Sequence, residues 1–251
     1  MERRNHGASQ GNLAVETQFD QNERERLLAQ YAEIATLAGG LAHEIKNPLS
    51  TISMNLELLA EELQDGDSPR DRRMLRKIEV VRRECRHLQE ILDAFLQFAR
   101  VGQLELVEAD LNRIVQDFIT FYQREAEKHG IEISPHLCPN LPPVQLDESL
   151  MRQVLMNLAR NAQQAMPNGG TLELQTYERD GRVVLEFIDN GVGMDERTRS
   201  KMFQVFFSTK PGGSGLGLPT VRKIVEAHHG TIECESEPGR GTRFTISLPV
   251  S

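Results

Sequence analysis

A histidine followed by a glutamate stands in the stretch LAHEIKNPLS, residues 41–50. A His-Glu pair also begins the zinc motif H-E-x-x-H, in which two histidines one helical turn apart bind the metal. Here the fifth position is Asn47 and Pro48 follows it, so the second zinc ligand is missing. A neutral imidazole is nucleophilic near neutral pH, and a neighbouring carboxylate can accept its proton. His43 and Glu44 are therefore a candidate nucleophile and base rather than half of a zinc site, although a lone surface histidine is usually inert.

Two glycine-rich segments form a second candidate site: DNGVGMD (189–195) and KPGGSGLGLPT (210–220). Glycines let the backbone approach a ligand closely, and successive N–H groups can surround a phosphate. Pro219 is placed where it would stand in the first turn of a following helix, whose N-terminus attracts anions. Neither segment completes G-x-G-x-x-G after a strand or the P-loop motif, so a dinucleotide fold and P-loop chemistry are not predicted. Taken singly, each segment is equally typical of a plain loop.

A pair of amides supports a phosphate site. Asn157 and Asn161 lie four residues apart in NLARNAQQA, on the same face of a predicted helix. Amides among apolar residues need hydrogen-bond partners, and a carboxamide oxygen suits Mg²⁺, which usually arrives with the phosphates of a nucleotide.

The composition restricts the class of protein. The chain has 251 residues, a net charge of −8 and three cysteines, none of them in a CxxC pair. This acidity argues against a dedicated nucleic-acid binder, and the cysteine count argues against a disulfide framework or a cysteine zinc site. No apolar run approaches the length of a membrane helix, and the polar residues 1–22 are no secretory signal, so we expect a flexible lead-in and a cytoplasmic protein without a membrane span.

Residues 23–101 are predicted to form a helical hairpin. Apolar residues recur with heptad spacing from Leu27 to Leu63, with a shift of phase around Pro48, and again from Met74 to Ala99. The turn-forming segment QDGDSPR, residues 64–70, separates the two runs. A single hairpin cannot cover its own apolar seams, so a homodimer with a four-helix bundle is expected. The alternative is that the seams pack on the rest of the same chain.

Residues 102–251 alternate short strands with helices. Asp147 is a good N-cap for a helix through MRQVLMNLARNAQQAM, and a β-hairpin is expected to turn at Asp180-Gly181. VRKIVEAHHG is predicted to be a helix that ends at Gly230, and a second hairpin is predicted to turn over residues 238–241. This mixture is typical of an α/β sandwich with one helical layer on one sheet.

Five motifs in this order resemble those of two-component sensor histidine kinases: LAHEIKNPL the H-box, NLARNAQQA the N-box, DNGVGMD the G1 box, MFQVFFSTK the F-box and GGSGLGL the G2 box. HEIKNP together with FFSTKPGGSGLGL is most similar to the nitrogen-regulation type. The resemblance implies an α+β protein, with a dimeric phosphotransfer hairpin followed by a Bergerat-type (GHKL) ATP-binding domain at 102–251. One difference is His228-His229-Gly230, where His-Gly-Gly is common, and we expect it to be a variation at the surface.

The resemblance also implies roles for residues. Asp189 would hydrogen-bond the adenine amino group, Asn161 would bind Mg²⁺, and Asn157 would support the phosphates, with Lys210 in a lid over the triphosphate of ATP. The implied ATP-binding set comprises Asn157, Asn161, Asp189, Gly191, Gly193, Thr209, Lys210, Gly213, Ser214, Gly215, Leu216, Gly217 and Leu218. His43 would be phosphorylated with Glu44 assisting, and the phosphoryl group would pass to the receiver domain of a response regulator.

Helix geometry gives independent support for His43. At roughly 100° per residue it points away from the seam position Leu41 and toward solvent, where a γ-phosphate could reach it. Asn47 lies one turn further on the same face, and in relatives an amide there places the water that dephosphorylates the regulator. We therefore expect phosphatase activity as well. Pro48 permits a bend below the histidine, although it can equally be a kink without consequence.

Rival interpretations exist within the same fold. A chaperone- or gyrase-like ATPase carries a glutamate as the water-activating residue at the position of Asn157, and a non-catalytic ATP-binding scaffold would only dock partners. The eight basic residues within 70–87 are either a landing face for a receiver domain or simply a solvated helix face. No sensor domain is recognisable before the hairpin, so the signal is expected from a partner protein, from the short N-terminus, or from a part of the protein that this chain lacks.

Overall fold

A computed structural model describes residues 44–63, 68–101, 104–210 and 212–251 of the chain. The chain divides into two compact units, Met1–Cys85 and Arg86–Ser251, and each is described by itself. The predicted domain boundary between residues 101 and 102 stays a prediction. His43 lies outside the described residues.

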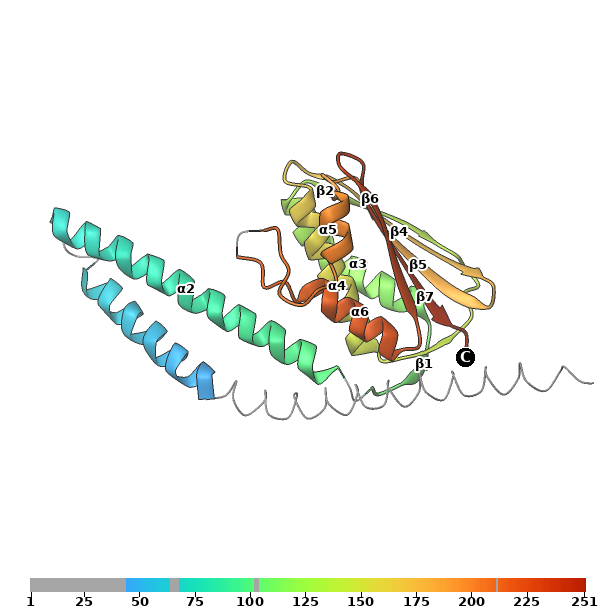
Figure 1. Cartoon of the computed structure of the whole chain (residues 1–251), viewed down its shortest axis with the longest axis horizontal. Coiled ribbons are helices and arrows are strands. Elements are labelled where there is room, and N and C mark those ends of the chain that lie inside the picture. Colours follow the sequence, from blue (N-terminus) through green and yellow to red (C-terminus); the bar gives the residue numbers. More distant parts are fainter. Residues whose placement is uncertain (1–43, 64–67, 102–103, 211) are drawn as a thin grey trace, which may run out of the picture. The chain divides into compact units, whose positions relative to one another are not determined.

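Two helices joined by a short connection account for the predicted hairpin (Figure 1). One covers residues 44–63 and the other, α2, runs over Pro69–Arg100. Ser68 caps the N-terminus of α2: its hydroxyl accepts a hydrogen bond from the backbone N–H of Asp71 at 3.1 Å. An ion pair of 2.9 Å between Arg82 and Glu57 joins the two helices. Pro48 lies within the first helix, which continues past it to residue 63.

The heptad positions of the hairpin separate into two sets by their burial. Leu49, Ile78 and Cys85 are buried at 5–8% exposure. The alternate positions are each 41–50% exposed: Ile45, Ile52 and Leu59 on the first helix, and Met74, Val81 and Leu88 on α2. One apolar stripe therefore fills the hairpin, and the second lies open on the surface of the single chain.

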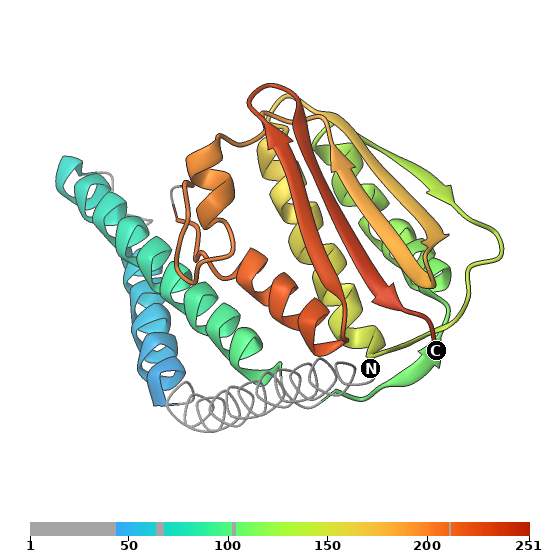
Figure 2. The same ribbon diagram turned by 45° about the vertical axis from the view of Figure 1, so that its right-hand side comes forward.

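The second unit is built on a five-stranded sheet (Figure 2). Its strand order is β2-β4-β5-β7-β6, in which β2 runs parallel to β4 and every other neighbouring pair is antiparallel. The strands are β2 (Ile131–Leu137), β4 (Gly170–Arg179), β5 (Arg182–Asp189), β6 (Thr231–Glu237) and β7 (Gly241–Pro249). A separate pair joins β1 (Val107–Ala109) to β3 (Val144–Leu146), and β3 is a strand that the sequence analysis did not predict.

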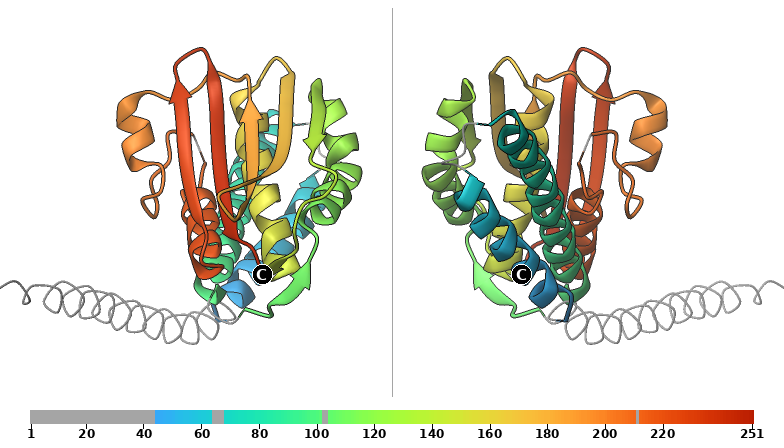
Figure 3. Two further views of the ribbon diagram at one scale, coloured as in Figure 1. Left: turned by 90° about the vertical axis from the view of Figure 1, so that its right-hand side faces the viewer. Right: turned by 90° about the vertical axis from the view of Figure 1, so that its left-hand side faces the viewer.

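Three helices cover one face of this sheet (Figure 3): α3 (Leu111–Lys128), α4 (Glu148–Ala165) and α6 (Gly217–Ala227). The short helix α5 (Glu196–Lys201) precedes the segment that leads to α6. Asp110, Asp147 and Asp195 cap α3, α4 and α5 by accepting backbone N–H groups. Apolar faces of the helices and alternate residues of β4, β5 and β7 form one core. The predicted fold class, a helical hairpin followed by an α/β sandwich, is confirmed.

The predicted turns are present. Asp180 and Gly181 have φ angles of +54° and +69°, which two-residue hairpin turns of this type require, and they join β4 to β5. The second predicted hairpin turns between the end of β6 at Glu237 and the start of β7 at Gly241.

The end of α6 differs from the prediction. The helix ends at Ala227, and the left-handed residue after it is His229, at φ +57°, rather than Gly230. Position 230 needs a glycine for a different reason: there is no room for a side chain, because a Cβ there would lie 2.8 Å from Leu248 Cδ2.

The residue that varies in His228-His229-Gly230 is His229, which is exposed as expected, whereas the preceding His228 is only 2% exposed. Its Nε2 accepts the backbone N–H of Asp147 at 2.8 Å, so Nδ1 carries the proton and donates to the carbonyl of Ile224 at 2.7 Å. A neutral imidazole thus joins the end of α6 to the N-cap of α4. Burial lowers the pKa of His228 below its usual range.

Candidate functional site

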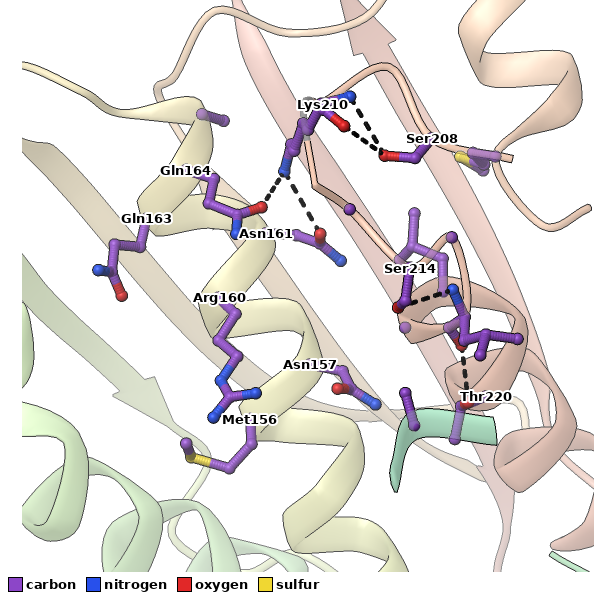
Figure 4. A pocket seen from close by; sticks show the side chains of 18 of the residues that line it. Met156, Asn157, Arg160, Asn161, Gln163, Gln164, Ser208, Lys210, Ser214 and Thr220 are labelled. Atoms are coloured by element: carbon purple, nitrogen blue, oxygen red, sulfur yellow. Dashed lines mark hydrogen bonds between the residues drawn. The ribbon is translucent and has the colours of Figure 1, made fainter. Parts of the chain in front are cut away.

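Helix α4 provides one wall of a pocket in the second unit. Its buried side faces the core with Met151, Val154, Leu155, Leu158, Ala159 and Ala162. Asn157 and Asn161 lie outside that stripe, half-buried, and both line the pocket (Figure 4). Among the described residues, Asn161 Nδ2 is one of three buried side-chain polar atoms without a hydrogen-bond partner. Because buried polar groups are normally paired, this amide is a natural place for a ligand contact.

Asp189 ends β5 at the floor of the pocket and is 6% exposed. One carboxylate oxygen accepts the backbone N–H of Gly191 at 2.9 Å, which is the Asx-type turn that the sequence DNG favours. Burial raises the pKa of Asp189, while backbone hydrogen bonds from Gly191 and Thr242 and the charge of Lys210 oppose that rise. A carboxylate has about four acceptor positions, so this turn leaves capacity for a ligand donor.

The segment after Asp189 packs directly on the end of α4. The N–H of Val192 donates to the carbonyl of Ala165 at 3.0 Å. A Cβ at Gly191 would lie 2.6 Å from that same carbonyl oxygen, so only glycine fits there. This contact fixes Asp189 relative to α4, which carries Asn157 and Asn161.

The loop between α5 and α6 provides the opposite wall, and we call its residues 208–210 and 212–216 the lid loop. The N–H of Phe206 donates to the carbonyl of Gly215 at 3.1 Å. A Cβ at Gly215, whose φ is +66°, would lie 2.5 Å from the carbonyl carbon of Phe206. The F-box and G2-box segments are thus in backbone contact, and Leu216 at the loop's end is fully buried.

The N-terminus of α6 opens onto the pocket. Its N-cap, Leu216, makes no side-chain capping bond, whereas aspartates cap α3, α4 and α5. Pro219 lies in the first turn, as predicted. A Cβ at Gly217 would lie 4.0 Å from Asn157 Oδ1, so the amide of Asn157 faces this helix start. Uncapped N–H groups and the helix dipole favour an anion here.

Lys210 extends from the lid loop to α4 (Figure 4). Its ammonium lies 2.6 Å from Gln164 Oε1 and 3.4 Å from Asn161 Oδ1. Burial lowers the pKa of Lys210, and the charge of Asp189 opposes that fall. The lysine therefore contributes positive charge beside the amides of α4 and interacts electrostatically with the buried carboxylate of Asp189.

The structure brings the predicted ATP-binding residues together with one exception. All of them line this pocket apart from Gly191, which packs behind it against α4. Glu44 and Asn47 lie on the helix over residues 44–63, and both are exposed. The pocket is also lined by Gln164, Arg160 and Thr220, which were not predicted from the sequence. Spacing gave a usable signal for Gln164, since it stands three residues after Asn161 on the same helix face.

The donor set fits a magnesium nucleotide. Asn161 Oδ1 is a hard oxygen ligand of the kind that Mg²⁺ takes, and the ammonium of Lys210, 3.4 Å from it, can pair with the phosphates that bring the metal. In the described part of the chain, no cluster of three or more His, Cys, Asp and Glu side chains could hold a metal ion. A metal at Asn161 would therefore depend on the phosphates of its nucleotide for most of its ligands.

Comparison with known proteins agrees with this geometry. The His Kinase A (phospho-acceptor) domain matches residues 33–104, and the family of histidine kinase-, DNA gyrase B- and HSP90-like ATPases matches residues 146–251. Sensor histidine kinase ZraS of Klebsiella oxytoca is 35% identical over 229 residues, covering 91% of this chain and 48% of the relative. The chain belongs to the sensor histidine kinases.

Signal transduction histidine-protein kinase AtoS of Escherichia coli K12 is 32% identical over 98% of this histidine kinase chain and 40% of its own length. The chain thus spans less than half of each of these two curated relatives. The crystal structure of full-length ShkA in complex with AMPPNP matches with a TM-score of 0.68 and 28% identity, over 85% of this chain and 45% of that one. The catalytic domain of histidine kinase ThkA matches with a TM-score of 0.53 and 27% identity, over 58% and 95% of the two chains. Within the described residues, no helix is long and apolar enough to cross a membrane.

Proposed function

We propose that this chain is an ATP-dependent protein-histidine kinase of a two-component system. It binds ATP with Mg²⁺, phosphorylates His43 and passes the phosphoryl group to an aspartate in the receiver domain of a response regulator. Its motifs HEIKNP and FFSTKPGGSGLGL support placement in the nitrogen-regulation-like subgroup.

One observation carries the proposal: three groups that bind phosphate or its metal meet at one pocket. They are the amide of Asn161, the ammonium of Lys210 and the uncapped N-terminus of α6. The buried carboxylate of Asp189 lines the same pocket and provides an acceptor for an adenine amino group. Asn157 occupies the place of the water-activating glutamate of the related ATPases, and an amide is no base, so transfer to a side chain is favoured over hydrolysis.

The chemical step is phosphoryl transfer to imidazole. A ring nitrogen of His43 attacks the γ-phosphorus, the bond to the bridging oxygen breaks and ADP leaves. The other ring nitrogen loses its proton to Glu44, which leaves a neutral phosphorylated imidazole. Lys210 and the α6 N-terminus neutralise charge on the phosphates, and Mg²⁺ held at Asn161 would add charge neutralisation at the transferring group.

The hairpin supports the proposal of a homodimer. Its open stripe repeats every seven residues on both helices, from Ile45 to Leu59 and from Met74 to Leu88. A second copy of the same stripe would cover it and complete a four-helix bundle. Asn47 is exposed on the same hairpin, where its amide can place a water molecule for dephosphorylation of the regulator.

The test is incubation of the full chain with γ-labelled ATP and Mg²⁺. Wild-type protein should retain an acid-labile, alkali-stable label, and His43→Gln should retain none. His136→Gln, a change to an exposed histidine on β2, is the matched control and should label as wild type. Label that persists in His43→Gln would refute the site. Release of free phosphate without any protein label would favour the ATPase alternative.

The phosphatase activity needs a separate arm with the phosphorylated regulator. Asn47→Ala should label normally at His43 yet dephosphorylate the regulator at least about tenfold more slowly, because no amide remains to place the water. Asn55→Ala removes an exposed amide two turns further along the same helix, whose Nδ2 donates to the Thr51 carbonyl at 2.8 Å, and should leave the rate unchanged. Equal rates in all three proteins would remove the phosphatase role from Asn47.

A further inference from the structure

The contact between Lys210 and Gln164 has no part in the proposed kinase chemistry. Gln164 accepts from the lysine ammonium at 2.6 Å, a shorter contact than the 3.4 Å to Asn161. The two amides stand three residues apart on α4 and therefore on one face, with the ammonium between them (Figure 4). Both bonds have the same ionised donor, which makes each stronger than a bond between neutral groups, and the much shorter one makes Gln164 the principal anchor of this side chain.

The backbone around Lys210 is fixed locally by its own loop. Lys210 N–H donates to Ser208 Oγ at 3.1 Å, and the carbonyl of Lys210 accepts from Gly213 N–H at 3.2 Å. Among the described residues, the hydrogen bonds between the lid loop and α4 run through the Lys210 ammonium alone. Releasing this one side chain would therefore remove the hydrogen bonds that hold the loop to α4.

The position of the ammonium conflicts with a metal at Asn161. A magnesium ligand lies about 2.1 Å from the ion. With the ammonium 3.4 Å from the same Asn161 oxygen, the two cations would be no more than about 5.5 Å apart and would repel each other. Only an anion between them removes the conflict, and phosphate is such an anion. The lysine is then expected to exchange Gln164 for a phosphate oxygen.

We infer that Gln164 is a positioning residue that latches the lid loop through Lys210, and that binding of a magnesium nucleotide opens the latch. The Lys210 ammonium has two alternative partners: the Gln164 amide when no anion competes, and the phosphates when the nucleotide is bound. The contact with the phosphates rests on the proposed ATP-binding function, whereas the latch at Gln164 does not. The latch depends on the side-chain oxygen of Gln164 as a hydrogen-bond acceptor and not on the volume of the side chain.

The latch is tested by hydrogen exchange of the full-length chain without nucleotide or metal. Gln164→Met keeps the length of the side chain and removes the acceptor, so the lid-loop amides should exchange roughly threefold to tenfold faster. Gln164→Glu restores an acceptor and should exchange no faster than wild type, which separates the acceptor from a merely structural role. Gln116→Met, the same change at an exposed position of α3 outside the pocket, should have no effect on the loop.

A double variant and a titration complete the test. If the latch acts through Lys210, Gln164→Met should add nothing to the exchange rate of Lys210→Met. Titration with AMP-PNP and Mg²⁺ should show several-fold tighter binding to Gln164→Met than to wild type, because the lysine no longer has to leave the amide. Unchanged lid-loop exchange in Gln164→Met would overturn the latch. Faster exchange with unchanged affinity would overturn its coupling to nucleotide. Failure of the wild-type protein to bind AMP-PNP would instead overturn the proposed function while the exchange result stands.

Discussion

The helices of the hairpin and those of the α/β sandwich both have periodic apolar faces, but these faces differ in how completely they are covered. In the sandwich, helices α3, α4 and α6 cover the sheet, and side chains such as Phe187 and Leu155 are at most 1% exposed. In the hairpin, alternate heptad positions such as Val81 and Leu88 remain 45% and 50% exposed. The sandwich therefore completes its core within one chain, whereas the hairpin needs a surface from elsewhere. Stability of the first is a property of the monomer, and if a second copy covers the open stripe as proposed, stability of the second depends on protein concentration.

The largest expected effect comes from breaking the self-contained core. Phe187 on β5 is buried, and its ring packs against that of Phe118 at a centroid distance of 6.4 Å. Phe187→Ala should destabilise the sandwich by about 3–5 kcal/mol through the lost burial and the cavity left behind. Phe121→Ala, at a side chain 74% exposed on α3, should cost less than about 0.5 kcal/mol.

The measurement for this pair is denaturant unfolding followed by circular dichroism, in which the hairpin and the sandwich are expected to give separate transitions. The Phe187 variant should lower the midpoint of the sandwich transition and leave that of the hairpin in place. An equal loss in both transitions would show that the hairpin and the sandwich unfold as one cooperative unit.

The next effect tests the open stripe of the hairpin. Val81→Lys places a charge at the centre of the proposed subunit contact, so the dimer dissociation constant should rise by roughly a hundredfold, about 2.7 kcal/mol. Val80→Lys is the matched control, since Val80 is adjacent and 54% exposed but off the stripe. Sedimentation of the full chain over a concentration series separates the two variants. Equal behaviour of both would mean that the stripe is not the dimer contact.

Whether a structural feature could be predicted from the sequence depends on how far apart in the chain its interacting residues lie. The caps at Asp147 and the turn at Asp180-Gly181 depend on neighbours within four residues, and both were predicted correctly. The buried state of His228 depends on a backbone N–H 81 residues away, and no local pattern indicates it. The heptad run likewise predicts an apolar seam, but whether a position faces the other helix or the open stripe is decided only when the two helices pair.

The candidate site divides in the same way. Asn157 and Asn161 are one helical turn apart, so their common face was readable from spacing. Gln164 stands on that face too, yet its partner Lys210 is 46 residues away, and only the fold shows the contact. The short strand β3 was missed because three residues in a Pro-rich stretch carry too little periodicity to be recognised.

The smallest expected effect is a dependence of the sandwich's stability on pH, because the sandwich buries an ionisable side chain in its core. His228 is buried, and the titratable groups acting on it are Asp147, which raises its pKa, and His229, which lowers it. Burial has the largest effect and holds the folded-state pKa below the ordinary value of 6.5. The unfolded chain therefore binds the proton more readily, and the contribution of His228 to stability is complete above about pH 6.5 and is lost as the pH falls below it.

Unfolding of the sandwich measured at pH 7.5 and 5.5 tests this sign. His228→Gln should cost about 1 kcal/mol at pH 7.5, from the weakened bond to the Asp147 N–H, and should lose less further stability on acidification than the wild type. Phe121→Ala, at a non-titratable and exposed side chain of α3, should keep the wild-type slope. A wild-type slope in His228→Gln would mean that protonation of this imidazole is not what acid acts on, and that the link from α6 to α4 does not need its neutral form.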